Sequence, residues 1–67
     1  MTVEELLKLQ IALNHILEDR VDNQDFVILD KYGFIYYKKI NNVQYILYPN
    51  KKDVPKILND IKKNLGE

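Results

Sequence analysis

The side chains that most often carry catalysis are scarce in this chain. It contains no serine and no cysteine, so neither a serine triad nor a thiol nucleophile can be assembled. His15 is the single imidazole. On a helical wheel its ring points away from the apolar stripe, between Lys8 and Asp19, so we expect a surface histidine. One imidazole without a thiolate also excludes the usual zinc sites.

The acidic residues are numerous, but their positions do not predict an acid–base pair. Glu4 and Glu5 begin a predicted helix, whereas Asp19, Asp22 and Asp25 fall in a predicted loop. General acid–base catalysis needs carboxylates opposed across a shaped cleft. The loop also lacks the glycine and the terminal glutamate of an EF-hand. We therefore expect a protein that is not an enzyme and that holds no metal and no cofactor.

The tyrosines are the more promising residues. Residues 36–39 read Tyr-Tyr-Lys-Lys, and Tyr45 and Tyr48 follow on the next predicted strand. Aromatic side chains on a sheet can stack on unpaired bases. Adjacent strand residues point to opposite faces, however, so one face gathers only about two tyrosines. Tyrosine is equally typical of protein interfaces and of cores, and these three interpretations remain open.

The chain begins with a predicted helix whose apolar surface is wider than one core requires. Thr2 and Glu5 have the spacing of a capping box. The apolar stripe that follows consists of Leu6, Leu9, Leu13, Ile16 and Leu17. Leu7 and Ile11 widen the arc to roughly 200°, with Gln10 and Asn14 forming a polar seam between them. We expect this helix to contact the sheet and, in addition, either the second helix or a second molecule.

The middle of the chain predicts a three-stranded antiparallel meander. Residues 18–25 are polar and predict a loop, and residues 26–29 form a short apolar run typical of a strand. Residues 30–33 (Asp-Lys-Tyr-Gly) predict a tight turn into a strand over residues 34–40. A two-residue turn at Asn41-Asn42 leads to a third strand over residues 43–48, which Pro49 ends.

The pairing that follows from this turn leaves the sheet without a polar face. Ile40 lies opposite Val43, and Tyr37 lies opposite Ile46. Both faces then carry isoleucine and tyrosine, although a sheet with one wet face normally has a polar side. Two helices can cover only one face of the sheet. We therefore expect the uncovered face to stay rich in tyrosine and isoleucine in the monomer.

A second helix is predicted to begin near Asp53 or Pro55, positions where these residues favour a helix start. Its single narrow stripe consists of Val54, Ile57, Leu58, Ile61 and Leu65, and Gly66 is suited to its C-terminal cap. The predicted fold is thus one α+β domain over residues 1–67, helix–three strands–helix in two layers.

Charge and composition add weaker signals. Residues 1–30 hold seven acids against Lys8 and Arg20, a net −5, and residues 31–67 hold eight lysines against three acids, a net +5. This asymmetry fits either a polyanion-binding side or attraction between the two helices. No apolar run is long enough to span a membrane, and the acidic N-terminal residues differ from a secretory signal, so we expect a cytoplasmic protein. Lys, Asn and Ile are abundant and have AT-rich codons, so an AT-rich genome explains this bias. Together with the small size, it would suit a phage or mobile-element gene.

The predicted element order resembles that of double-stranded-RNA-binding domains, and of small toxin RNases with the same layout. Residues 51–56 (Lys-Lys-Asp-Val-Pro-Lys) come close to the Lys-Lys-x-x-Lys signal with which the RNA-binding family holds phosphates. The chain departs from that family in its short turn at residues 30–33 and in its acidic first helix. The toxin RNases need a histidine on a strand, whereas His15 lies on the predicted first helix, so the chain departs from them as well.

Two functions are therefore predicted. The first is a small non-enzymatic protein-interaction or regulatory module, either a homodimer or an inhibitor or adaptor of a larger protein. Its interface would consist of Leu7, Gln10, Ile11, Asn14, Tyr37 and Tyr48. The alternative is a nucleic-acid-binding domain, as the resemblance implies, acting through Lys51, Lys52, Lys56, Lys62 and Lys63.

Overall fold

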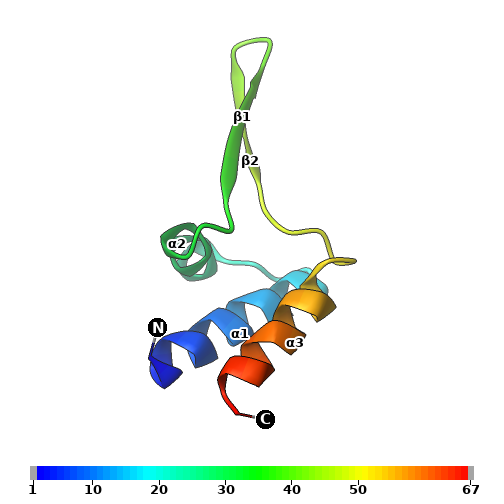
Figure 1. The fold of residues 1–67 in the computed structure, drawn as a ribbon. Coiled ribbons are helices and arrows are strands. Elements are labelled where there is room, and N and C mark those ends of the chain that lie inside the picture. The colour runs from blue at the N-terminus through cyan, green and yellow to red at the C-terminus, as the bar shows by residue number, and fades with distance from the viewer. Residues whose placement is uncertain (1, 67) are drawn as a thin grey trace.

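A computed structural model of the protein describes residues 2–66 and has two parts, a three-helix body and a projecting β-hairpin (Figure 1). The elements in order are α1 (Val3–Leu17), α2 (Asn23–Lys31), β1 (Tyr36–Ile40), β2 (Val43–Leu47) and α3 (Val54–Asn64). The described molecule measures 45 × 22 × 18 Å, and the hairpin extends along its length. The α+β class is confirmed, whereas the predicted third strand is not present in the described residues.

Helix α1 begins and ends with side chains suited to those positions. The Thr2 hydroxyl accepts a hydrogen bond from the Glu5 backbone N–H at 3.1 Å, which satisfies one of the donors that a helix start leaves unpaired. At the other end Asp19 has a φ of 56°, and the Arg20 N–H donates to the His15 carbonyl. This is a Schellman ending, with aspartate in the position usually held by glycine.

Helix α2 corrects the prediction of a loop over residues 18–25 and a strand over residues 26–29. Asp22 and Asp25 form a reciprocal capping box: the Asp25 N–H donates to Asp22 Oδ1 at 2.9 Å, and the Asp22 N–H donates to Asp25 Oδ2 at 3.1 Å. The predicted tight turn at residues 30–33 is instead the end of this helix. Gly33 has a φ of 79°, and the Phe34 N–H donates to the Leu29 carbonyl at 2.8 Å.

The β-hairpin has the predicted turn and register. Asn41 and Asn42 have φ angles of 52° and 66°, the left-handed conformation that a two-residue hairpin turn requires. Ile40 pairs with Val43, and the ladder continues outwards to the pair Tyr36 and Leu47. The strands are one or two residues shorter than predicted.

Helix α3 places its apolar stripe as predicted and ends at Asn64, and Gly66, two residues further on, has a φ of 82°. Val54 and Ile61 are buried, and Ile57, Leu58 and Leu65 pack against the core. Asp53 precedes the helix but makes no side-chain capping bond.

The core lies entirely between the helices. The eight buried apolar side chains among residues 2–66 are Leu6, Leu9, Ala12, Leu13, Ile16, Leu29, Val54 and Ile61. Helix α1 packs against both α2 and α3, which lie on either side of it in Figure 1. The prediction that α1 packs on the sheet is therefore wrong, because α2 takes the place that the sheet was expected to fill.

Candidate interaction surface

The hairpin is exposed over its whole length. All ten residues of β1 and β2 are exposed, on both faces of the sheet. Exposed fractions are 65% for Tyr36, 47% for Tyr45, 50% for Ile46 and 45% for Leu47. The expectation that two helices cover one face of the sheet is wrong, since the hairpin stands away from the helical body (Figure 1). Among residues 2–66, therefore, no helix covers either face of the hairpin.

The base of the hairpin is fixed to the body through aromatic packing. Phe26 of α2 and Tyr48, one residue beyond β2, meet edge to face with ring centroids 5.6 Å apart and an interplanar angle of 70°, a favourable arrangement for an aromatic pair. Phe34 and Ile35, just before β1, also pack against the core. The hairpin is thus held at its base by side chains outside the paired strands.

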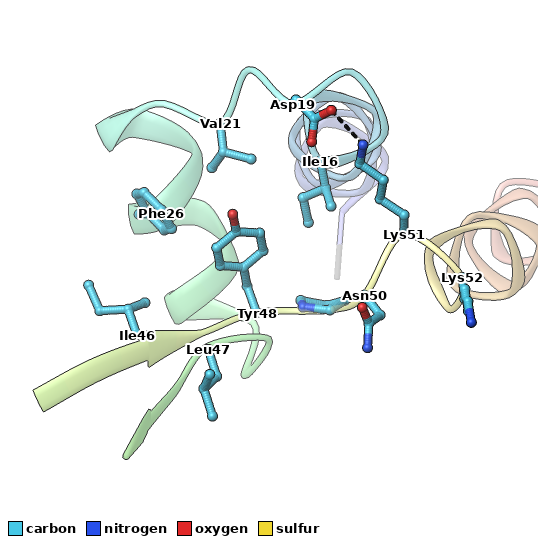
Figure 2. A pocket seen from close by; sticks show the side chains of 11 residues that line it. Ile16, Asp19, Val21, Phe26, Ile46, Leu47, Tyr48, Asn50, Lys51 and Lys52 are labelled. Atoms are coloured by element: carbon cyan, nitrogen blue, oxygen red, sulfur yellow. Dashed lines mark hydrogen bonds and ion pairs between the residues drawn. The ribbon is translucent and has the colours of Figure 1, made fainter. Parts of the chain in front are cut away.

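A hollow of about 630 Å³ opens beside this base, between α1, α2 and the segment after β2 (Figure 2). Ile16, Val21 and Phe26 contribute its apolar wall, and Tyr48 borders it. An ion pair between Asp19 and Lys51 crosses its rim. Ile46 and Leu47 point to opposite sides of the strand, as alternating strand residues do.

The two edges of the hairpin differ in charge. Strand β1 reads Tyr-Tyr-Lys-Lys-Ile, with Lys38 and Lys39 near its centre, whereas β2 reads Val-Gln-Tyr-Ile-Leu and carries no charge. Lysine on an edge strand is a common protection against pairing with another chain. Of the two edges, only that of β1 has this protection.

The interface residues predicted on α1 lie on a separate surface. Leu7 is 46% exposed and Ile11 is 55% exposed, Asn14 is exposed, and Gln10 is half-buried. Ile11 borders a second hollow, of about 500 Å³, between α1 and α2, opposite the exposed Val27. Two of the predicted interface residues, Tyr37 and Tyr48, lie on the hairpin and at its base, and the prediction omitted Tyr36, Tyr45, Ile46 and Leu47. The sequence feature that could have identified these four residues is the lack of a polar face on the predicted sheet.

His15 is half-buried and paired, which corrects the prediction of a surface histidine. Its ring Nδ1 lies 2.8 Å from Asp25 Oδ2, and the Asp25 side chain is buried. The same carboxylate completes the capping box of α2, so the pair links α1 to the start of α2.

A second polar contact joins the start of α1 to the end of α2. The Tyr32 hydroxyl donates a short hydrogen bond to Glu5 Oε2. This bond lowers the pKa of the Glu5 carboxyl and raises the pKa of Tyr32 to about 12, because it stabilises the charged acceptor and the protonated donor. Lys31 Nζ lies 5.5 Å from the centre of the Tyr32 ring. The contact stabilises the packing of α2 on α1.

The lysines predicted to bind nucleic acid lie on α3 and just before it. Lys51, Lys52, Lys56, Lys62 and Lys63 are all exposed. Lys51 is engaged by Asp19, and Lys56 and Lys62 border a shallow hollow beside Leu17. The element order on which the resemblance to double-stranded-RNA-binding domains rested is not that of this fold, because α2 replaces the first strand.

Comparisons with protein-family models, with curated proteins and with solved structures found no match. Within residues 2–66, no helix is both long and apolar enough to cross a membrane. The same residues include no group of three or more His, Cys, Asp or Glu side chains arranged to hold a metal ion.

Proposed function

We propose that this protein is a small, non-enzymatic, cytoplasmic interaction module that binds another protein surface through its hairpin. The observation that carries the proposal is the exposure of both hairpin faces, which places Tyr36, Tyr37, Ile40, Val43, Tyr45, Ile46 and Leu47 in solvent together. A contiguous exposed apolar surface is typical of a protein-binding site. A two-stranded hairpin on its own is also only marginally stable in water. A partner that covers the hairpin would remove its apolar side chains from water and would also stabilise its two strands.

Site-specific photo-crosslinking in cells tests this proposal. A benzophenone amino acid at Tyr37 or Ile46 should give a defined protein adduct on irradiation. The same group at Lys63, which is exposed near the end of α3, is the matched control and should give none. Equal adducts at all three positions, or adducts at Lys63 alone, would contradict an interface on the hairpin.

A second candidate function is nucleic-acid binding, which the exposure of Lys56, Lys62 and Lys63 on α3, and of Lys52 just before it, favours. Lys38 and Lys39 on the hairpin add two further positive charges, and a two-stranded ribbon fits the major groove of DNA. Binding of this kind weakens steeply as salt rises. A mobility shift with double-stranded RNA or DNA at low salt, lost in a Lys56→Glu, Lys63→Glu variant, would support it, and no shift at low salt would refute it.

A further inference from the structure

The outer edge of β2 presents backbone groups in a defined pattern. In a hairpin with a two-residue turn, the residues that flank the turn exchange both of their hydrogen bonds. Ile40 and Val43 are that pair here, so every second residue of β2 faces β1. Gln44 and Ile46 therefore direct their N–H and C=O groups away from β1. These groups can accept another strand.

The charges on the hairpin decide which edge can pair with a copy of itself. If two β1 strands paired about their midpoint, Lys38 would lie opposite Lys38 of the second copy, and like charges directly opposite are destabilising. A pair of β2 strands brings no charge to the seam. The two β1 strands would then be the outer strands of a four-stranded sheet, about 14 Å apart. At that distance their lysines are largely screened at physiological salt.

Resting on the proposed function, we infer that the partner is a second copy of this chain, which joins by antiparallel β2–β2 pairing about a two-fold axis at Tyr45. Gln44 of each copy would hydrogen-bond with Ile46 of the other, which uses all the outward-facing backbone groups of both strands. Tyr45 would lie opposite Tyr45 of the second copy, in a pair without mutual backbone hydrogen bonds, where side chains approach most closely.

The side chains along β2 match this arrangement. Val43 would lie opposite Leu47 of the second copy, so the row across the seam is apolar or aromatic on the face that carries Val43, Tyr45 and Leu47. The pairing converts two marginal hairpins into one four-stranded sheet, which meets the usual requirement for a stable sheet. It also places the uncharged tip, Asn41-Asn42, beside Tyr48 of the second copy, at the border of the hollow in Figure 2. A second copy therefore fits the edge in charge, in side-chain type and in length.

Paired charge variants at position 45 test the register directly. Tyr45→Glu and Tyr45→Lys should each weaken self-association, measured by sedimentation equilibrium, by about tenfold or more. An equimolar mixture of the two variants should restore association, because a glutamate in one copy then faces a lysine in the other. Val27→Glu and Val27→Lys, at an exposed apolar site of α2 outside the hairpin, are the matched controls and should associate nearly as the unaltered protein does.

Disulfide trapping is an independent measurement, since the chain has no cysteine of its own. Tyr45→Cys should form a covalent dimer on mild oxidation, and Val27→Cys, on α2, should not. Circular dichroism should show that all the variants keep their helices, because the buried core comes from the helices alone.

Several outcomes would overturn the inference. A monomeric unaltered protein at millimolar concentration would do so, as would failure of the mixed variants to restore association. If the protein is monomeric but photo-crosslinks through its hairpin to another protein, the inference fails and the proposed function stands. If no protein adduct forms at the hairpin, both fail.

Discussion

Leu29 and Leu47 are the same residue type, in helix α2 and strand β2 respectively, yet they have opposite surroundings. Leu29 is fully buried, with 0% of its surface exposed, and Leu47 is 45% exposed. The same contrast holds throughout the two regions: the helices contribute every buried apolar side chain within residues 2–66, and every hairpin strand residue is exposed. Apolar side chains on the helices therefore form the folding core. Apolar side chains on the hairpin remain exposed, and a second molecule would be needed to bury them.

The largest difference between the two regions is expected from truncating one leucine in each of them. Leu29→Ala should lower the free energy of unfolding by about 2–5 kcal/mol, because it removes buried methyl groups and leaves a cavity. Leu47→Ala, its matched control on β2, should change it by less than about 0.5–1 kcal/mol in dilute monomer. Urea denaturation followed by circular dichroism measures both. Equal losses would mean that the hairpin is part of the folding core.

A smaller loss is expected from the polar link between α1 and α2. Asp25→Ala removes a capping residue and leaves His15 without its partner, so the free energy of unfolding should fall by about 1–3 kcal/mol. Asp30→Ala, at an exposed site in the last turn of the same helix, is the control and should cost less than about 0.5 kcal/mol. Equal effects of the two substitutions would argue against the capping role of Asp25.

The hairpin turn should respond locally and not globally. Asn42 has a φ of 66°, which alanine adopts at a cost of about 1 kcal/mol relative to asparagine or glycine. Asn42→Ala should therefore increase amide hydrogen exchange in β1 and β2 and leave exchange in α1 unchanged, and Asn42→Gly should restore protection. Exchange that rises equally in α1 would show that the two regions unfold as one unit.

The smallest expected effect concerns the Glu5–Tyr32 contact. Because folding lowers the pKa of Glu5, its contribution to stability is present above the unfolded pKa of about 4.3 and is lost as the pH falls through the folded value. Because folding raises the pKa of Tyr32 to about 12, its contribution is present below about pH 10 and is lost as the pH rises towards 12. Tyr32→Phe should lower the melting temperature at pH 7 by a few degrees.

The melting curves can separate this contact from general charge effects. The difference in melting temperature between Tyr32→Phe and the unaltered protein should shrink as the pH falls through the acid range, where Glu5 takes up a proton. Tyr36→Phe, on the exposed hairpin, should match the unaltered protein at every pH. A constant difference across the acid range would assign the loss to packing of the Tyr32 ring.

The candidate surface was only partly predictable from the sequence. Tyr37 and Tyr48 were predicted because of their residue type, and the lack of a polar face predicted surplus apolar surface. The sequence does not show how many helices cover the sheet. That number depends on which elements pack against the wide apolar arc of α1. Once α2 and α3 occupy that arc, the described part of the chain has no further helix to cover the hairpin.

Local rules by themselves determined α1, the hairpin register and α3. Each depends on contacts between residues close in sequence: a cap at Thr2, left-handed asparagines at the turn and a single apolar stripe in α3. Residues 26–29 could not be assigned in this way, since a short apolar run suits a strand or a buried helical turn equally. The capping pair Asp22 and Asp25 and the terminal Gly33 were present as helix signals, but burial of Leu29 against α1 decides between the two. Only the tertiary structure made α2 a helix, and by doing so it left the hairpin uncovered.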